Sequence, residues 1–211
     1  MPVTTYDLFG QQATGTALTA DPTSYTLGMQ WAVILTAGQT AVLSGLRFYS
    51  AAGAGVLPTH IINYDVNSQA AIDDQVASWS GAAGSGWVTA LFTVPPSLAS
   101  GVKYKAAVYQ PNAANWYSNT ANYWTSGAGS AGVTNGPLSA PNSAGGAQGQ
   151  DSFVVGGPTY PNAGSGANYW IDVVVAVTTP AAGGGAPDRH HHRTPAGRIG
   201  QHRPGGRGGV R

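Results

Sequence analysis

Four stretches of the sequence alternate apolar with other side chains at a period of two, the pattern of a half-buried β-strand. The clearest is NYWIDVVVAVTTP, residues 168–180, where aliphatic side chains recur at every second position. The positions predicted to face a core are Ile171, Val173, Val175 and Val177. Trp170 and Asp172 are predicted to face away from it. A chain with several such strands has to bury one face of each against another layer.

The other three stretches are AVLSGLRFYS, HIINYDV and VKYKAAVY. In the first, Leu46 and Phe48 are predicted to point inward and Arg47 outward. In the last, Tyr104 and its period-two neighbours point inward, and Lys105 points outward. In HIINYDV, residues 60–66, one predicted face carries Ile62, Tyr64 and Val66, and the opposite face carries Ile61, Asn63 and Asp65. These assignments predict which side of each strand meets the core.

Composition supports an all-β fold. Only 8% of residues are charged and there is no Glu, whereas helices rely on Glu, Lys and Arg. Further strand candidates are YTLGMQWAVIL, QVASWS, WVTALFTV and SFVV. About eight to ten strands predict two antiparallel sheets packed face to face, a β-sandwich or jelly roll. One marginal helical turn is predicted at residues 68–78, and long Gly-rich loops between 126 and 166.

Charge divides the chain into two regions. Residues 1–180 contain three cations and seven acids, a net charge of −4, and residues 181–211 contain six arginines and one Asp, a net charge of +5. The second region has almost no large apolar residue, so it cannot offset the entropy of ordering itself. We therefore expect a sandwich domain at 1–180 and a flexible, disordered basic tail at 181–211.

Catalysis is not expected from these residues, so we predict that the protein is not an enzyme. Glycosidases use two carboxylates flanking a sugar bond, but Asp73 and Asp74 are the only adjacent acids and are interpreted as part of a solvated turn. A Ser-His-Asp arrangement would have to use His60, the only histidine before residue 181, and no G-x-S-x-G motif occurs.

No cofactor is predicted, and the metal content is left open. Calcium in jelly-roll loops is held by Asp, Asn and backbone carbonyls, but the spacing of the candidates singles out no site. These candidates are Asp65, Asn67, Asp73, Asp74 and Asp151. A second set, residues 190–192 with His202, has the side chains that transition metals prefer but lies in the tail, which lacks a fixed geometry.

The aromatic residues suggest either a core or a binding surface. Trp31, Trp87 and Tyr104 are predicted to be in the core. The segment NWYSNTANYWTSG interleaves aromatic and hydroxyl or amide side chains, which suits stacking on sugar rings. The candidate glycan surface consists of Trp116, Tyr117, Tyr123 and Trp124. The alternative is that these four rings close one end of the sandwich and are buried.

The tail arginines are predicted to act as a tether to a polyanion or to an acidic protein partner. They are Arg189, Arg193, Arg198, Arg203, Arg207 and Arg211. Separated cations on a flexible chain bind polyanions without specificity, so no specific nucleic acid is expected. Membrane insertion is not expected either, because no apolar stretch approaches the ~18 residues of a spanning segment.

Several strand sequences, taken together, resemble the DUF4082 family of bacterial domains of unknown function. The resemblance covers most of residues 6–177. The matching elements are YTLGMQWAV (25–33), LSGLRFYS (43–50), SGWVTALFTVP (85–95), VKYKAAVYQPNAANWYS (102–118), NGPLSA (135–140) and NYWIDVVV (168–175).

This resemblance implies a β-sandwich module of secreted or surface proteins and of tail proteins of actinobacterial phages, without catalytic residues. The opening MPVTTYDLFG lacks the pattern of an export signal. We therefore expect a virion structural or adhesion protein, either a minor tail protein or a capsid decoration protein. It would be present in repeated copies among other virion proteins. The alternative is a secreted or cell-surface module that binds bacterial cell-wall polysaccharide or a host surface glycan.

Overall fold

The computed structural model describes residues 1–12, 17–19, 23–111, 116–142, 150–164 and 166–181, and these ranges contain strands and loops but no helix. All strand pairs are antiparallel. The strands are β1 (Val3–Tyr6), β2 (Ala17–Thr19), β3 (Tyr25–Val33), β4 (Thr40–Ser50), β5 (His60–Asp65), β6 (Ala71–Val76), β7 (Gly86–Leu91), β8 (Ser97–Leu98), β9 (Lys103–Gln110), β10 (Tyr117–Asn119), β11 (Val133–Asn135), β12 (Leu138–Ala140), β13 (Asp151–Val155) and β14 (Ile171–Thr178).

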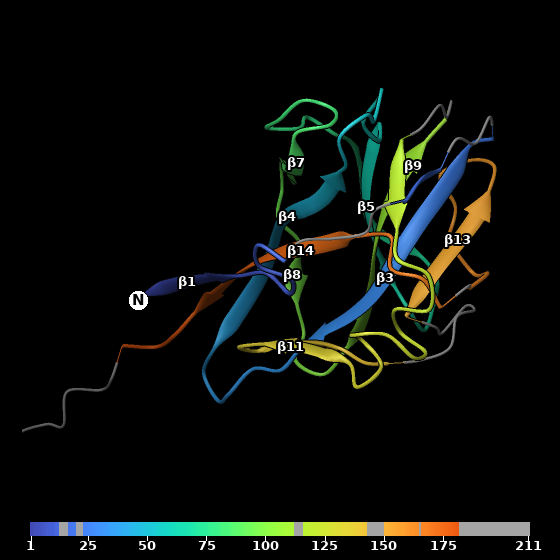
Figure 1. Ribbon diagram of the computed structural model, residues 1–211. Coiled ribbons are helices and arrows are strands. Elements are labelled where there is room, and N and C mark those ends of the chain that lie inside the picture. Colours follow the sequence, from blue (N-terminus) through green and yellow to red (C-terminus); the bar gives the residue numbers. More distant parts are fainter. Residues whose placement is uncertain (13–16, 20–22, 112–115, 143–149, 165, 182–211) are drawn as a thin grey trace, which may run out of the picture. The chain divides into compact units, whose positions relative to one another are not determined.

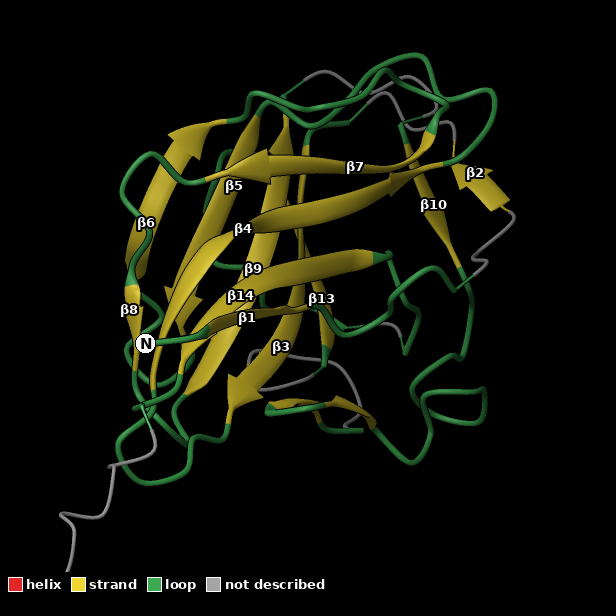
Figure 2. Ribbon diagram, turned by 90° about the vertical axis from the view of Figure 1, so that its left-hand side faces the viewer, coloured by secondary structure: helices red, strands yellow, loops and turns green. Residues whose placement is uncertain are grey.

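Two main sheets form a sandwich, as predicted. The five-stranded sheet has the order β1-β14-β4-β7, with β8 also pairing with β4. The seven-stranded sheet has the order β11-β12-β3-β9-β5-β6, with β13 also pairing with β3. The two layers can be followed in Figure 1, and in Figure 2 the strands of the first sheet lie in front of those of the second. The short strands β2 and β10 form a separate pair.

The core lies between the two sheets and uses the predicted period-two faces. Leu46 and Phe48 of β4 are fully buried in it. So are the four aliphatic residues of β14 that alternate from Ile171 to Val177. At ~25 cal/mol per Å² of apolar surface, burial of this kind is the main stabilising term of the fold. The inward assignment of these residues is confirmed.

The seven-stranded sheet is covered on its second face as well. Ile62, Tyr64, Ala107 and Tyr160 form a smaller buried cluster there. The chain that follows β13 crosses this face, where the Tyr64 hydroxyl donates to the Pro158 carbonyl (3.3 Å). Both faces of β5 are therefore buried, which explains why its sequence carries apolar residues on both sides.

Lys105 points outward from the main core, as predicted, but it is buried there under the same crossing chain. Its side chain does lie on the face opposite the main core, but the segment after β13 covers it. Lys105 Nζ donates to Ser152 Oγ (2.6 Å) and to the Pro161 carbonyl (3.1 Å). It also lies 4.6 Å from the centre of the Tyr160 ring. The alternation gave the correct face but could not show that a later segment covers it.

Two local predictions are wrong. Residues 71–76, which include Asp73 and Asp74, form the edge strand β6 instead of a solvated turn or a helical turn, because β5 offers them a pairing partner. The segment predicted as loop between 126 and 166 contains the hairpin of β11 and β12. Gly136 lies in its turn with a positive φ of 55°, a conformation that favours glycine.

Candidate functional site

The four aromatic residues of the candidate glycan surface are buried. Trp116, Tyr117, Tyr123 and Trp124 expose 0%, 8%, 4% and 2% of their surface. A ring stacks on a sugar only if one of its faces is accessible. These residues therefore do not form an exposed stacking surface, and the structure corresponds to the alternative in which they close the sandwich.

Two of these rings, Tyr123 and Trp124, pack around Phe9 together with Trp87 and Trp170. The centre of the Phe9 ring lies 6.4 Å from that of Tyr123, 6.2 Å from that of Trp124 and 5.3 Å from that of Trp170. Trp87 stacks on Phe9 at 6.4 Å. Most of these pairs meet edge to face or at a tilt, so the rings fill space efficiently. Each pair stabilises the fold by more than the apolar area that it buries. The cluster anchors the N-terminal segment.

Trp170 is buried, contrary to its predicted outward position, because its backbone leaves the strand conformation. Its φ is 54°, in the left-handed region that is unfavourable for a bulky residue. Two hydrogen bonds hold this conformation, from Trp170 N to Asn168 Oδ1 (2.9 Å) and from Trp170 Nε1 to Thr120 Oγ1 (3.1 Å). The period-two pattern therefore begins only at Ile171, and the indole ring turns into the Phe9 cluster.

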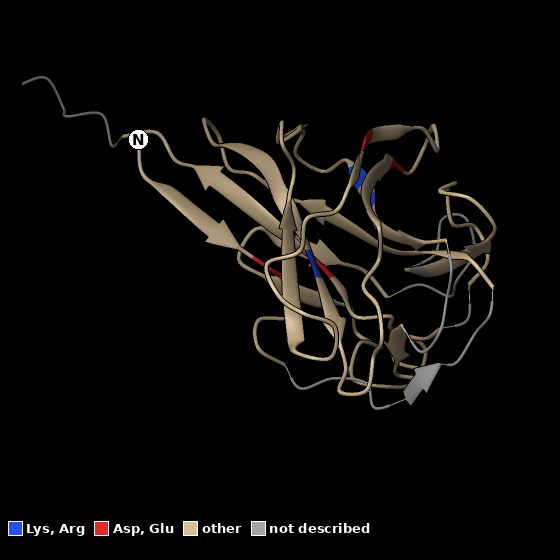
Figure 3. Ribbon diagram, turned by 90° about the horizontal axis from the view of Figure 1, so that it is seen from above, with Lys and Arg blue, Asp and Glu red and all other residues tan. Residues whose placement is uncertain are grey.

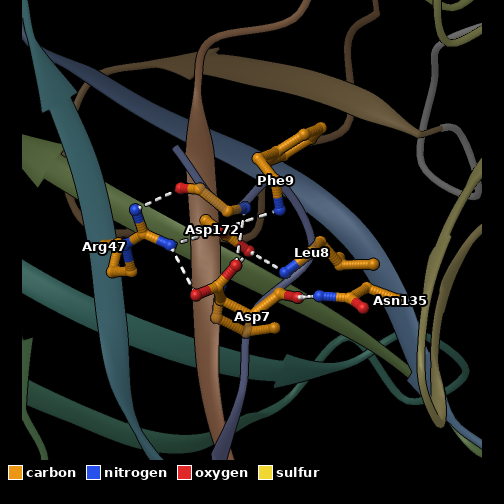
Figure 4. A network of polar contacts seen from close by, with 8 residues as sticks. Asp7, Leu8, Phe9, Arg47, Asn135 and Asp172 are labelled. Carbon is orange, nitrogen blue, oxygen red and sulfur yellow. Dashed lines mark hydrogen bonds and ion pairs between the residues drawn. The ribbon is translucent and has the colours of Figure 1, made fainter. Parts of the chain in front are cut away.

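Asp172 lies on the predicted outer face of β14 but is fully buried, because residues 7–10 cover it. Its Oδ1 accepts hydrogen bonds from Leu8 N (2.8 Å) and Val173 N (2.7 Å). Its Oδ2 accepts from Phe9 N (3.1 Å) and Arg47 Nη1 (3.2 Å). Figure 4 shows the carboxylate surrounded by these donors. The predicted outer face of Asp172 is therefore correct, but alternation could not reveal that Leu8, 164 positions earlier, helps to cover it.

Arg47 connects this carboxylate to the covering segment. Its Nη1 is 2.8 Å from Asp7 Oδ2, and its Nη2 donates to the Gly10 carbonyl (2.6 Å). The guanidinium also lies 4.5 Å from the centre of the Trp87 ring. Arg47 is therefore buried between two carboxylates, a carbonyl and an aromatic face. These contacts fasten the chain after β1 across the five-stranded sheet.

The network predicts a pH dependence of stability. Burial raises the pKa of Asp172 to about 6, although the three backbone N–H donors and the charge of Arg47 act in the opposite direction. An unfolded Asp has a pKa of ~3.9, so between these values the folded state binds more protons. The stability that the folded state gains when Asp172 binds a proton is fully present below about pH 4 and is lost as the pH rises through about 6. The total change in the free energy of unfolding is on the order of 3 kcal/mol.

The measurement is the free energy of unfolding in urea across this pH range. We expect the wild-type value to fall as the pH rises from about 4 to about 6, and Asp172→Asn, which does not titrate, to lack that part of the slope. An identical pH profile for the two proteins would show that Asp172 does not take up a proton on folding.

Two depressions lie between described residues. The larger, of about 450 Å³, is lined by small polar and aliphatic residues of the β3–β4 loop, β4 and the chain around β8. Polar groups of this depression already form hydrogen bonds within the loops. Leu35 N donates to Ser100 Oγ (2.8 Å), and Thr36 N donates to Gln39 Oε1 (2.9 Å). The smaller, of about 120 Å³, is lined by Tyr25, Leu27, Tyr117, Phe153 and Tyr169.

This aromatic pocket is the candidate binding site. Of its lining residues, only Tyr117 was among the predicted glycan contacts. Sequence analysis missed Tyr25, Phe153 and Tyr169, which come from three distant segments. The sequence gave only a weak signal, because each is an aromatic residue in or near a strand and close to Gly, Ser or Asn residues.

The candidate metal ligands do not converge in the described part of the chain. No group of three or more His, Asp or Glu side chains there is placed to hold a metal ion. Asp65 Oδ1 accepts from Asn67 N (3.0 Å) and Ser68 N (2.7 Å) in the β5–β6 turn, and these bonds lower the pKa of Asp65. Asp74 Oδ1 lies 2.8 Å from His60 Nδ1.

Other residues that the sequence predicted as metal ligands or as a tether lie outside the part of the chain that the structure describes. The side chain of Asp151 is not described, and neither are residues 182–211, with the tail histidines and the six predicted tether arginines. Met1–Ala181 form one compact unit. The described residues contain no helix of the length and apolarity needed to cross a bilayer.

These observations define the class of protein: an all-β sandwich whose ionisable side chains fasten strands and loops and whose aromatic rings fill one part of the structure. The chain belongs to the DUF4082 family, described as a domain of unknown function, and the family model matches residues 11–171. The predicted family is thus confirmed. No curated protein and no solved structure matches the chain.

Proposed function

We propose that this protein is a non-catalytic structural and adhesion component of a phage particle, a minor tail protein or a capsid decoration protein. It would display the sandwich at the virion surface, in contact with other virion proteins or further copies of itself. The family resemblance suggests this setting.

One structural observation favours a holding role. Charged residues are sparse along the ribbon (Figure 3), and those with the closest contacts bind strands and loops. Arg47 and Asp172 fasten the N-terminal segment, and Lys105 fastens the chain after β13. A general acid or base needs access to a reacting group, whereas these groups are covered by protein.

The proposal predicts that the chain co-purifies with particles. Particles purified through a density gradient are expected to contain it at a fixed ratio to the major capsid protein, measured by quantitative mass spectrometry. Antibodies raised against the full chain should label the head or the tail in immunogold microscopy. Finding the chain only in the particle-free soluble fraction of the lysate would defeat the proposal.

A second candidate function, recognition of a bacterial surface polysaccharide, is favoured by the aromatic pocket. Tyr25, Tyr117, Phe153 and Tyr169 bring three phenols and a phenyl ring to one depression. The test is retention of the full chain on purified host cell wall, with and without competing polysaccharide. A decoration protein with such a pocket would serve both functions.

A further inference from the structure

The aromatic pocket is built from parts of the sandwich that are far apart in sequence. Tyr25 begins β3, Tyr117 begins β10, Phe153 is in the middle of β13, and Tyr169 lies two positions before the start of β14. Leu27, which belongs to the main core, completes the lining. In Figure 1, β3 and β13 run next to each other at the same side of the molecule. The site is thus carried by paired strands and not by one loop.

The four rings hold one another in place. Tyr25 contacts Tyr117 at a ring-centre distance of 6.3 Å and Phe153 at 6.1 Å, and Tyr117 contacts Tyr169 at 5.8 Å. The planes of these pairs meet at 71°, 68° and 79°. Tyr25 and Phe153 are half-buried and supply the accessible ring surface of the pocket, whereas Tyr117 and Tyr169, 8% and 7% exposed, mainly support them. Because the rings are already packed, a ligand would lose little affinity to their ordering.

The lining selects a neutral ligand that is apolar on one side and polar on its edge. The described lining residues include no Asp, Glu, Lys, Arg or His, so these residues favour an uncharged ligand. Aromatic faces attract C–H groups, and tyrosine adds a hydroxyl that both donates and accepts. A pyranose ring has this combination, with C–H groups on its faces and hydroxyls around its edge.

The size of the pocket limits how much of a ligand it can hold. Its volume of about 120 Å³ is below the ~300 to 1,000 Å³ of sites that enclose drug-sized molecules. It therefore accommodates one ring-sized group and leaves the rest of the ligand outside. The described lining residues of the larger depression include no aromatic ring, so they offer no stacking surface to a sugar.

We propose that the pocket formed by Tyr25, Tyr117, Phe153 and Tyr169 binds one uncharged sugar residue at the end or branch point of a glycan. This inference deepens the polysaccharide-binding candidate and rests on it. A single sugar in a small open pocket binds weakly, in the millimolar range. Repeated copies on a particle would raise the effective affinity by avidity.

The experiment is a titration of the isotopically labelled full chain with methyl glycosides of glucose, galactose, mannose and N-acetylglucosamine, followed by two-dimensional NMR. Choline chloride and N-acetylprolinamide are titrated in parallel, because a cation or a prolyl group is the other small ligand that aromatic walls accept. We expect at least one glycoside to shift the backbone resonances of Tyr25, Tyr117, Phe153 and Tyr169 saturably.

Three variants connect the shifts to the pocket. Tyr25→Phe removes one hydroxyl and keeps the ring, and Phe153→Leu removes a ring and keeps an apolar side chain. Each is expected to weaken glycoside binding about three- to tenfold. Tyr109→Leu is the matched control, since Tyr109 is a half-buried aromatic residue of β9 outside the pocket, and should leave binding unchanged. The same spectra report whether each variant is folded.

The outcomes separate this inference from the wider function. It is overturned if no glycoside gives saturable shifts, if only choline or prolinamide binds, if the shifts cluster at Thr36 and Ser97 of the larger depression, or if both variants bind like the wild type. Retention on cell wall that survives Tyr25→Phe and Phe153→Leu would leave polysaccharide binding in place and remove this pocket from it.

Discussion

Replacing Asp172 by asparagine is expected to lower the free energy of unfolding at neutral pH by about 1 to 3 kcal/mol, the usual cost of leaving buried N–H donors without an acceptor, because Arg47 keeps its ion pair with Asp7. The carboxylate accepts two hydrogen bonds at each oxygen, whereas asparagine keeps one oxygen and places an NH2 group against donors. Either the N–H groups of Leu8 and Val173 or those of Phe9 and Arg47 then lose their acceptor.

The measurement is urea unfolding of the full chain at neutral pH, followed by tryptophan fluorescence. Asp74→Asn is the matched control, because it makes the same chemical change at a partly exposed residue whose contact is with His60, and it should change stability by about 0.5 kcal/mol or less. Hydrogen exchange at Leu8 and Phe9 should accelerate in Asp172→Asn. A loss below about 1 kcal/mol would mean that the network contributes little to holding the N-terminal segment.

The contrast between β14 and its surroundings shows what local sequence can predict. Alternation alone identified the inward residues from Ile171 to Val177, because the period of a strand is a property of neighbouring residues. Burial of Asp172 and Lys105 depends on segments that cross the outer faces of the two sheets, and no local pattern encodes such a cover. Alternation therefore placed both residues on the correct outer faces but gave no sign that each is buried there with hydrogen-bond partners.

The candidate site was harder to predict than the fold, for a related reason. A run of aromatic and polar residues is compatible with a sugar-binding surface and with a buried end of the sandwich, and only the tertiary structure shows that Trp116 and Trp124 are inside. The aromatic pocket combines Tyr25, Phe153 and Tyr169 with Tyr117, and the first two come together because β13 pairs with β3. That pairing joins strands more than a hundred positions apart, beyond the reach of any motif.

Trp116→Ala is expected to destabilise the protein by about 3 to 5 kcal/mol, the typical range for truncating a buried tryptophan. Trp116 is fully buried, and its ring centre lies 6.1 Å from that of Phe48 and 5.0 Å from that of Tyr117. Its Nε1 has no hydrogen-bond partner in the described part of the chain. The loss is therefore one of packing, and a cavity between the sheets remains.

Trp116→Phe controls for the loss of packing, because it keeps an aromatic ring at the same place and is expected to cost less than about half as much. The stability of both variants is measured by urea unfolding. Their binding is measured as retention on host cell wall without denaturant, under conditions where each variant is folded. Burial predicts that Trp116→Ala loses stability and that any folded fraction binds like the wild type. If Trp116→Ala keeps wild-type stability but loses binding, the ring is exposed and contacts the glycan. If the aromatic segment is buried, the substitution lowers the free energy of unfolding and leaves glycan binding unchanged. If it is an exposed binding surface, the substitution weakens glycan binding and leaves the free energy of unfolding unchanged.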